Sequence, residues 1–237
     1  FTTFANIFYL KDSGIQYHRS NIGGRKNRGN NDLYERLFSK ESNYFEHSVN
    51  TYYGKQVTKY YMVENSDEFF NLDYKKILKS NESVSFNQNT FNIDKKIVWR
   101  QTADKLIAAI DTHRRWFRNT IQCAYLREEF QDEFDYYFVL AIFNSKYIEY
   151  CYKQLVNESG RTFAQVKLTH LKKLPFPLIV PKQEQAEISC LVKKAIEFAS
   201  QNKTLDSLQN EIDNRIFKLY KVSEEQQREI LENLKSK

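Results

Sequence analysis

The sequence is poor in proline, glycine and cysteine, and it has no long apolar run. Its 237 residues include only 3 Pro and 6 Gly, whereas 41% are hydrophobic and 28% are charged. This balance is typical of an ordered globular protein and excludes a disordered or collagen-like chain. No apolar run approaches the roughly 20 residues of a membrane span, so we expect no membrane partner. The chain starts at Phe1 without a methionine or a basic leader, and we therefore expect a fragment of a longer protein that carries no signal peptide.

Potential metal ligands and disulfide partners are few and scattered. The three cysteines are odd in number and far apart, which favours a reducing, intracellular location over a disulfide framework. The four histidines are equally dispersed, so we expect no metal site. The residues concerned are Cys123, Cys151 and Cys190, and His18, His47, His113 and His170.

Motifs that carry catalysis are also missing. All three prolines lie between positions 175 and 181 and none is adjacent to another, which excludes the [ND]-P-P-[YF] motif of amino-methyltransferases. Neither glycine-rich nucleotide-binding pattern is present. The nearest approach to a metal-dependent nuclease is Asp67, Asp73 and Lys75, but the preceding proline of that motif is missing and the expected helical setting is wrong. We predict no catalytic residue in this chain.

The positive charge is unevenly distributed. The formal net charge is +6, and residues 95–127 hold eight Lys and Arg against two acids, while residues 161–182 hold five and no acid. Clusters of this kind suit a partner lined with phosphates, although a solvated basic surface is the alternative. The loop Asn21–Asn30 adds three glycines interleaved with Arg25, Lys26 and Arg28, and it is either a DNA-contacting loop or a flexible surface loop.

Residue patterns predict a mixed α+β fold, in which a twisted β-sheet has flanking helices and a C-terminal helical hairpin follows. We expect two strands over 96–110 around Arg100–Thr102, further strands over 50–63 and 119–127, and helices over 67–79 and 135–156. Prolines make residues 174–177 extended, and Pro181 fits the first turn of a helix that ends near Ser200. Ser223 with Gln226 forms a capping box for a last helix. The expected division is 1–178 and 179–237.

A narrow apolar stripe follows in the C-terminal segment, at alternating three- and four-residue steps: Leu205, Leu208, Ile212, Ile216 and Leu219. The stripe suits a helical hairpin or a coiled-coil seam. Packing within the chain is the ordinary explanation, and a protein-interaction module that dimerises or docks through this stripe is the alternative.

Several segments, in this order along the chain, resemble the TaqI-like C-terminal specificity domain of adenine-specific methyltransferases and of fused Eco57I-type (type IIG) restriction–modification enzymes. The block Lys96–Ala103 with Leu106–Asp111 is similar to the central W-R-Q-T block of that domain. The other similar segments are 53–61, which departs from the family pattern at Gln56, and 116–122, 140–147, 160–168 and 171–177.

The resemblance implies a target-recognition domain over 1–178 that reads double-stranded DNA. The parent would be a bacterial or archaeal cytoplasmic enzyme, a site-specific adenine methyltransferase with or without a nuclease. Its S-adenosylmethionine-binding domain would lie N-terminal in the same polypeptide, so we expect no cofactor in this fragment. A type I specificity subunit, which shares the L-x-x-L-P-x-P segment, is the alternative.

Arginine pairs well with guanine, and glutamine or asparagine with adenine, so segments that place both side by side are candidate base readers. These are Arg100, Gln101 and Thr102; Arg161, Thr162 and Gln165; and Arg114 with Arg115. Buried ion pairs made by Arg100 and Arg161 are the alternative. Candidate phosphate contacts are Arg25, Lys26, Arg28, Lys55, Lys59, Lys105, Arg118 and Lys167.

Overall fold

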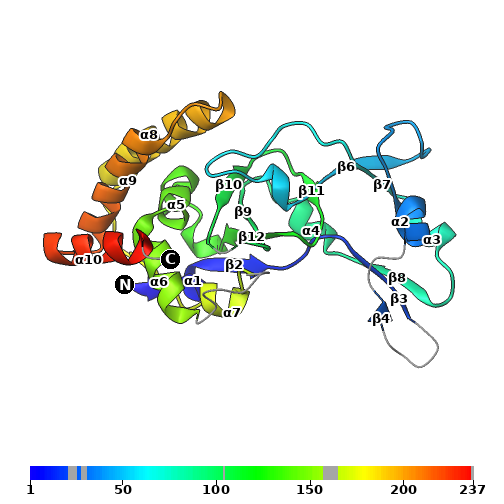
Figure 1. Cartoon of the computed structure of the whole chain (residues 1–237), viewed down its shortest axis with the longest axis horizontal. Helices are drawn as coiled ribbons and strands as arrows, with labels where there is room; N and C mark the ends of the chain where they lie inside the picture. Colours follow the sequence, from blue (N-terminus) through cyan, green and yellow to red (C-terminus); the bar gives the residue numbers. More distant parts are fainter. Residues whose placement is uncertain (21–25, 28–30, 104, 157–164, 236–237) are drawn as a thin grey trace.

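A four-stranded antiparallel sheet crosses the middle of an elongated molecule, with helices at one end and small sheets at the other (Figure 1). The structure is a computed structural model of residues 1–237, and it describes all of them except 21–25, 28–30, 104, 157–164 and 236–237, with only the backbone of 26–27. The mixed α+β class is confirmed.

The central sheet combines three strands that the sequence predicted with one, β2, that it did not. Its order is β10–β9–β12–β2, with β2 Phe8–Lys11, β9 Lys96–Arg100, β10 Ala108–Asp111 and β12 Ile121–Leu126. Ala108 pairs with Trp99, and Cys123 pairs with Val98. The expected strand pair over 96–110 and the strand over 119–127 are confirmed.

Alternate residues of the central strands enter two separate hydrophobic cores, because successive side chains of a strand point to opposite faces. Ile97 and Trp99 belong to the first core, while Val98 and Cys123 belong to the second. We call the part of the molecule built on the first core the helical side and the part built on the second core the strand side.

On the helical side, α5 packs on β9 and β10, and α8 covers α5. Helix α9 packs against α8 and α6, and α10 packs against α6. The short strands β1 Thr2–Thr3 and β13 Pro175–Phe176 pair beside this layer. The other elements here are α1 Phe4–Ile7, η2 Glu128–Phe130, α5 Tyr136–Phe143, α6 Lys146–Leu155, α7 Leu168–Leu171, α8 Lys182–Ser200, α9 Asp206–Leu219 and α10 Glu224–Lys235. Among the described residues, no helix is both long and apolar enough to cross a membrane.

The predicted helix over 135–156 forms as two helices, because Asn144 and Ser145 interrupt it. The side-chain amide of Asn144 accepts from the Ala108 N–H at 3.0 Å and donates to the Ala108 carbonyl at 2.9 Å. The Ser145 hydroxyl accepts from the Ile148 N–H at 3.2 Å and so caps α6. Asn144 thus joins the end of α5 to the edge strand β10, and Ser145 begins the next helix.

The C-terminal hairpin forms as predicted. Pro181 is the N-cap of α8, one position before the predicted first turn. Ile212 and Ile216 of the apolar stripe are fully buried in the first core. These two residues pack within the chain, and Leu205, Leu208 and Leu219 are partly buried against the same core. The capping box is confirmed, since Ser223 and Gln226 exchange hydrogen bonds of 2.9 and 3.3 Å.

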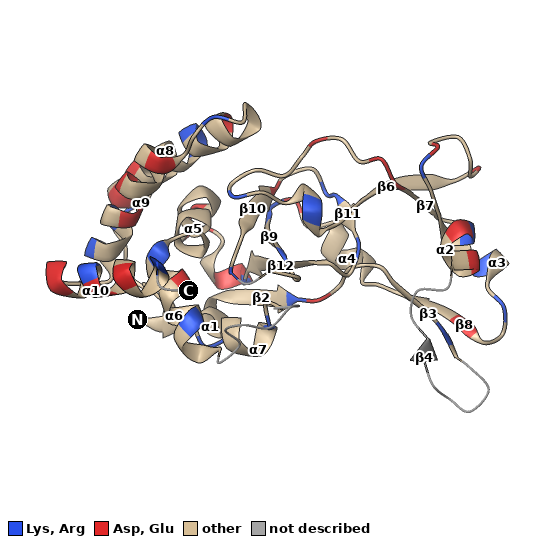
Figure 2. Cartoon of the chain, in the orientation of Figure 1, with Lys and Arg blue, Asp and Glu red and all other residues tan. Residues whose placement is uncertain are grey.

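The helices after residue 178 share the first core with the residues before it, and the division at 178 stays a prediction. Acidic and basic residues are interspersed along α8–α10 (Figure 2).

The strand side has two small sheets. One has the order β11–β6–β7–β5 and the other β4–β3–β8, and β11 runs parallel to β6. Their strands are β3 Gln16–Ser20, β4 Lys26–Asn27, β5 Phe38–Ser39, β6 Ser48–Tyr52, β7 Phe69–Asn71, β8 Glu82–Ser85 and β11 Trp116–Phe117. The helices are α2 Asn31–Leu37, α3 Tyr74–Ile77, α4 Gln88–Phe91 and the 3₁₀ helix η1 Gly54–Gln56.

Two predicted elements on the strand side are corrected. Residues 69–71 form strand β7 where a helix was expected, because Phe70 is fully buried between β5 and β6. Only 74–77 of that segment is helical. The strand expected over 50–63 ends at Tyr52, where Tyr53 and Gln56 form a capping box that turns the chain into η1.

Part-buried charges tie the strand side together. The Arg118 guanidinium lies 3.0 Å from the Glu68 carboxylate and 4.1 Å from the centre of the Phe38 ring. The Glu82 carboxylate has no exposed surface and pairs with Arg36 at 2.6 Å and with Arg19. Burial pushes the pKa of Glu82 up, but hydrogen bonds from Arg36, the Lys79 N–H and Arg19 outweigh it and lower the pKa to about 2.

Candidate nucleic-acid interface

The structure brings two of the predicted base-reading segments together. Thr102 and Gln165 form an isolated antiparallel bridge, and the Val166 N–H donates to the Gln101 carbonyl at 2.7 Å. Thr102 and Gln165 are both exposed. This edge follows β9 directly, so the central sheet fixes its position. Arg161 and Thr162 lie outside the described residues.

Arg100, at the end of β9, is half-buried, and its Nε donates to the Val57 carbonyl at 2.6 Å. That bond ties β9 to the segment after η1 and favours a structural role for part of this guanidinium. The preceding Trp99 is fully buried, and its indole N–H donates to the Gln122 side chain at 3.0 Å. The W-R-Q-T block thus holds the sheet through its first two residues and exposes the end of the block.

A buried ion pair holds the remaining predicted base-reading segment, Arg114 with Arg115. The Lys96 ammonium lies 2.8 Å from the Asp111 carboxylate, and neither side chain has exposed surface. The same carboxylate accepts from the backbone N–H groups of His113 and Arg115, both at 3.0 Å. Because Asp111 ends β10, these bonds fold residues 112–115 back into a tight turn, which we call the Asp111 turn.

The Asp111 turn gives its two arginines different settings. Arg115 has a side chain only 10% exposed, which lies 3.1 Å from Asp111 and over the Tyr52 ring. Arg114 is 62% exposed, pairs with Asp94 and has a positive φ of 52°. A non-glycine residue in this backbone region is held there by its surroundings, and such residues cluster at functional sites. The turn therefore presents Arg114 to solvent and commits Arg115 to the interior.

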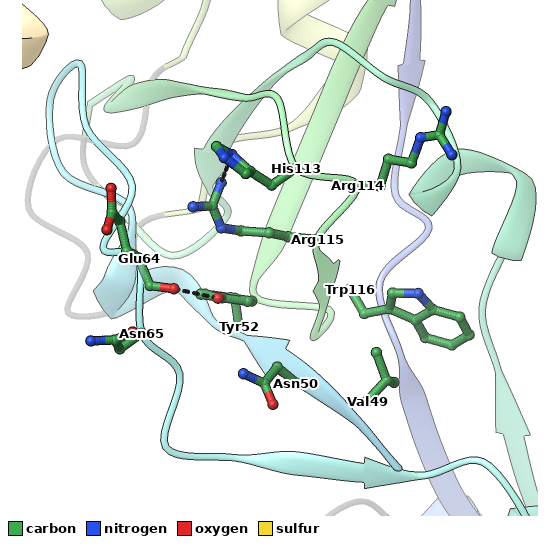
Figure 3. Close-up of a pocket in the computed structure, with 9 residues that line it drawn as sticks. All are labelled: Val49, Asn50, Tyr52, Glu64, Asn65, His113, Arg114, Arg115 and Trp116. Carbon is green, nitrogen blue, oxygen red and sulfur yellow. Dashed lines mark hydrogen bonds between the residues drawn. The ribbon is translucent and has the colours of Figure 1, made fainter. Parts of the chain in front are cut away.

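The Asp111 turn forms one wall of a groove of about 440 Å³, and β6 with residues 64–65 forms the opposite wall (Figure 3). We call it the β6 groove. A second hollow of about 320 Å³ shares Glu64, His113 and Arg115 with it and continues toward Tyr137 and Lys193 of the helical side. The lining residues of the β6 groove are Val49, Asn50, Tyr52, Glu64, Asn65, His113, Arg114, Arg115 and Trp116.

Hydrogen bonds to the backbone fix the wall at residues 63–65. The Tyr52 hydroxyl donates to the Glu64 carbonyl at 2.5 Å (Figure 3). The buried Gln56 side chain donates to the Asn65 carbonyl at 3.2 Å and accepts from the Tyr53 N–H at 2.8 Å. Gln56 is the position at which this segment departs from the pattern it resembles, and here its amide joins η1 to the groove wall.

The side chains predicted to contact phosphates differ in their exposure to solvent. Lys55, Lys105 and Lys167 are exposed. A hydrogen bond with the Tyr53 hydroxyl raises the pKa of Lys55. Lys59 is half-buried, and burial lowers its pKa. The guanidinium of Arg118 lies inside the strand side against Glu68, so we leave it out of the contact surface. Arg25 and Arg28 lie outside the described residues, as does the side chain of Lys26.

One group of potential metal ligands occurs among the residues that the structure describes, namely Glu46, His47 and Asp73. The Asp73 carboxylate already pairs with Lys76 at 2.8 Å and with His47 at 2.8 Å. Asp67, the other carboxylate of the nuclease alternative, instead accepts from the Tyr53 hydroxyl at 3.1 Å. The ligand group therefore combines Asp73 with Glu46 and His47, and it does not include Asp67 of the nuclease alternative.

The family model described as the TaqI-like C-terminal specificity domain matches residues 49–176, which is more than half of the chain. The chain belongs to this family. None of the curated proteins matches it. The resemblance read from the sequence is therefore confirmed, and membership of this specificity-domain family implies DNA sequence recognition in a restriction–modification system.

The matched region contains the exposed edge at Thr102 and Gln165, the Asp111 turn and the whole β6 groove. Sequence reasoning found the first two of these features. It missed the groove, because Asn50 and Asn65 are 15 positions apart in an unremarkable polar context and only the pairing of β6 with β11 brings Asn50 beside Trp116. The buried Lys96–Asp111 pair was also missed, since no sequence signal separates it from surface charges.

Proposed function

We propose that this chain is the sequence-reading domain of a restriction–modification N6-adenine methyltransferase, and that the catalytic domain lies outside these 237 residues. The family match carries the proposal, together with the exposed Thr102–Gln165 edge and the Asp111 turn that lie within it. The partners are double-stranded DNA and the methyltransferase domain of the same polypeptide.

The chemistry of the chain supports this division of labour. It has neither a glycine-rich cofactor loop nor an [ND]-P-P-[YF] motif, so S-adenosylmethionine and the reacting adenine belong to the other domain. What this chain supplies is binding energy and base choice. Exposed lysines neutralise phosphates and release counterions, and polar side chains pair with base edges.

Fluorescence anisotropy with labelled duplex DNA tests the DNA-binding part of the proposal. We expect binding that weakens steeply with salt, because phosphate neutralisation releases counterions. Lys105→Ala should reduce the slope of log K against log salt by about one, and it should weaken binding to all DNA sequences equally. The matched control is Lys218→Ala, an exposed lysine of α9, which should leave both unchanged. An absence of binding at low salt would contradict the proposal.

The methyltransferase part needs the complete gene product. Incubated with labelled S-adenosylmethionine and a duplex that contains the selected sequence, it should transfer the methyl group to an adenine N6. A complete protein that carries no methyltransferase domain, or that methylates cytosine, would contradict this part and leave the DNA-reading part standing.

A further inference from the structure

The β6 groove carries two side-chain amides that have no partner within the described part of the chain. Asn50, in β6, and Asn65, in the following segment, are both exposed, and neither amide makes a hydrogen bond there. Both lie on the same side of the groove (Figure 3). An asparagine amide offers one donor and one acceptor side by side, which matches the N6 and N7 edge of adenine in the major groove.

The charges of the groove argue for a base edge and against a phosphate. Arg115 pairs with the buried Asp111, and Arg114 points away from the amides and pairs with Asp94 (Figure 3). The exposed Glu64 lies beside Asn65 on the same wall. A phosphate placed against the two amides would be repelled by the Glu64 carboxylate, whereas a neutral base edge meets no such penalty.

The remaining wall is apolar and rigid. Trp116 is half-buried, and its ring lies 4.7 Å from Phe91 and 5.4 Å from Phe86, measured between ring centres. Val49 lies beside it in the groove. An apolar surface at this place suits the C5 methyl group of thymine, which is the one apolar feature that a base pair presents in the major groove.

Both amide-bearing segments are fixed before any ligand arrives. Asn50 pairs with Phe69 in the ladder between β6 and β7. The backbone at Asn65 is held by Gln56, and that at Glu64 by Tyr52. Side chains on a rigid backbone lose less freedom on binding, so a polar contact in this groove favours affinity and selectivity more than one on a loose loop.

We infer that the β6 groove reads one A·T base pair, with Asn50 and Asn65 on the adenine edge and Trp116 with Val49 against the thymine methyl group. The inference rests on the proposed function and deepens it, because it assigns a base-pair class and specific residues to DNA reading. Gln56 is a positioning residue, since it acts on the base through Asn65.

The test begins with selection of a consensus sequence by the full chain from a randomised duplex library. Binding is then measured after each A·T pair of the consensus is changed to G·C, one position at a time. At one A·T position, wild-type protein should lose roughly 5- to 100-fold in affinity, the range expected for a good amide–adenine contact. Asn65→Ala and Asn50→Ala should reduce that discrimination severalfold at this position and leave the other positions unchanged.

Three further arms sharpen the assignment. Asn65→Asp keeps the side-chain size but removes the donor, so it should also lose the preference for adenine. Replacement of thymine by deoxyuridine at the same position should weaken wild-type binding about two- to fivefold, because one methyl contact is lost. Asn43→Ala, which removes an exposed amide on the strand side outside the groove, is the matched control and should change nothing.

The possible outcomes distinguish failure of the proposed function from failure of the inference about the β6 groove. A wild-type chain that enriches no sequence overturns the proposed function and the inference with it. Normal enrichment together with unchanged discrimination in both asparagine variants overturns the inference alone. A uniform loss across all positions also overturns it, because that result marks phosphate contacts or misfolding, and an unchanged thermal transition excludes the second.

Discussion

The two sides of the central sheet are stabilised by different chemistry. On the helical side, fully buried apolar residues such as Phe138, Ile188 and Ile216 fill one large core. The Asn144 amide and the Asp213 carboxylate make buried polar contacts there, both with hydrogen bonds to backbone N–H groups. On the strand side, the core is smaller and charged groups penetrate it, including Glu82 and Asp111, whose side chains have no exposed surface.

This difference matches a division between support and presentation. Apolar packing is non-directional and tolerates a range of side-chain placements, so it suits a scaffold. Charged hydrogen bonds have strict geometry and are costly to leave unmade, so they fix turns in one shape. The Asp111 turn and the wall at residues 63–65 are held in this way, and both line the β6 groove.

Removal of the buried carboxylate on the strand side should have the largest effect on stability. Asp111→Ala leaves the Lys96 ammonium buried without its anion, and it should cost about 3–5 kcal/mol. Urea unfolding checks this value. The double variant Lys96→Met with Asp111→Leu should recover part of the loss, because it removes both charges. A cost below 1 kcal/mol for the single variant would contradict the account of the turn.

Acidification should affect the stability of the two sides differently. The pKa of Glu82 is lowered from its ordinary value of 4.5 to about 2, so its contribution to strand-side stability is complete above pH 4.5 and is lost as the pH falls toward 2. Burial raises the pKa of Asp213 on the helical side. The pH dependence of the Asp213 contribution therefore has the opposite sign. Its contribution to stability is present at low pH and is lost as the pH rises through the raised pKa.

The chain has two tryptophans, one for each side, which makes this comparison measurable. Trp99→Phe leaves Trp116 as a reporter of the strand side, and Trp116→Phe leaves Trp99 as a reporter of the helical side. On acidification, the Trp116 fluorescence should change at a higher pH than the Trp99 fluorescence. Coincident transitions in the two variants would show that the two sides lose their structure at the same pH, against this prediction.

Loss of a neutral hydrogen-bonding residue on the helical side should lower the free energy of unfolding less than loss of Asp111. Asn144→Ala removes both bonds to the Ala108 backbone. The buried Ala108 N–H then lacks a partner, while the Ala108 carbonyl keeps its bond from the Tyr60 N–H, so the change should cost about 1–3 kcal/mol. Thermal unfolding of this variant can be set beside that of Asn214→Ala, an exposed position on α9, where the change should stay within about 0.5 kcal/mol.

The smallest effect is expected where the backbone itself is strained. Arg114→Gly removes a surface ion pair and relieves the positive φ of 52°. Surface pairs contribute little, and glycine adopts this conformation readily, so stability should change by less than about 1 kcal/mol. Arg114→Val should be the more destabilising variant, because a β-branched residue tolerates a positive φ poorly. Equal stability of both variants would contradict the role of backbone strain at the turn.

Sequence patterns predicted β9, β10 and β12 of the central sheet and the C-terminal helices, because period-two strands such as 121–126 and capping signals such as Ser223 with Gln226 are local. They gave no sign of β2, the fourth strand of that sheet. They failed at residues 69–71, where burial of Phe70 between two other strands overrides a helix-like spacing. The candidate DNA contacts stay predictions. Residue type alone singles out Arg100–Thr102, Arg114, Arg115 and Arg118, but it does not show that Asp111 and Glu68 hold the last two largely inside the molecule.

In the proposed function, the strand side with its β6 groove and the Thr102–Gln165 edge face DNA, and α8–α10 support them without touching it. Hydrogen–deuterium exchange of the full chain, with and without its selected duplex, distinguishes these parts of the molecule. We expect slower exchange over residues 49–65 and 100–118 on DNA binding, and no change over α8–α10. Protection confined to α8–α10, with residues 49–65 and 112–116 unaffected, would contradict it.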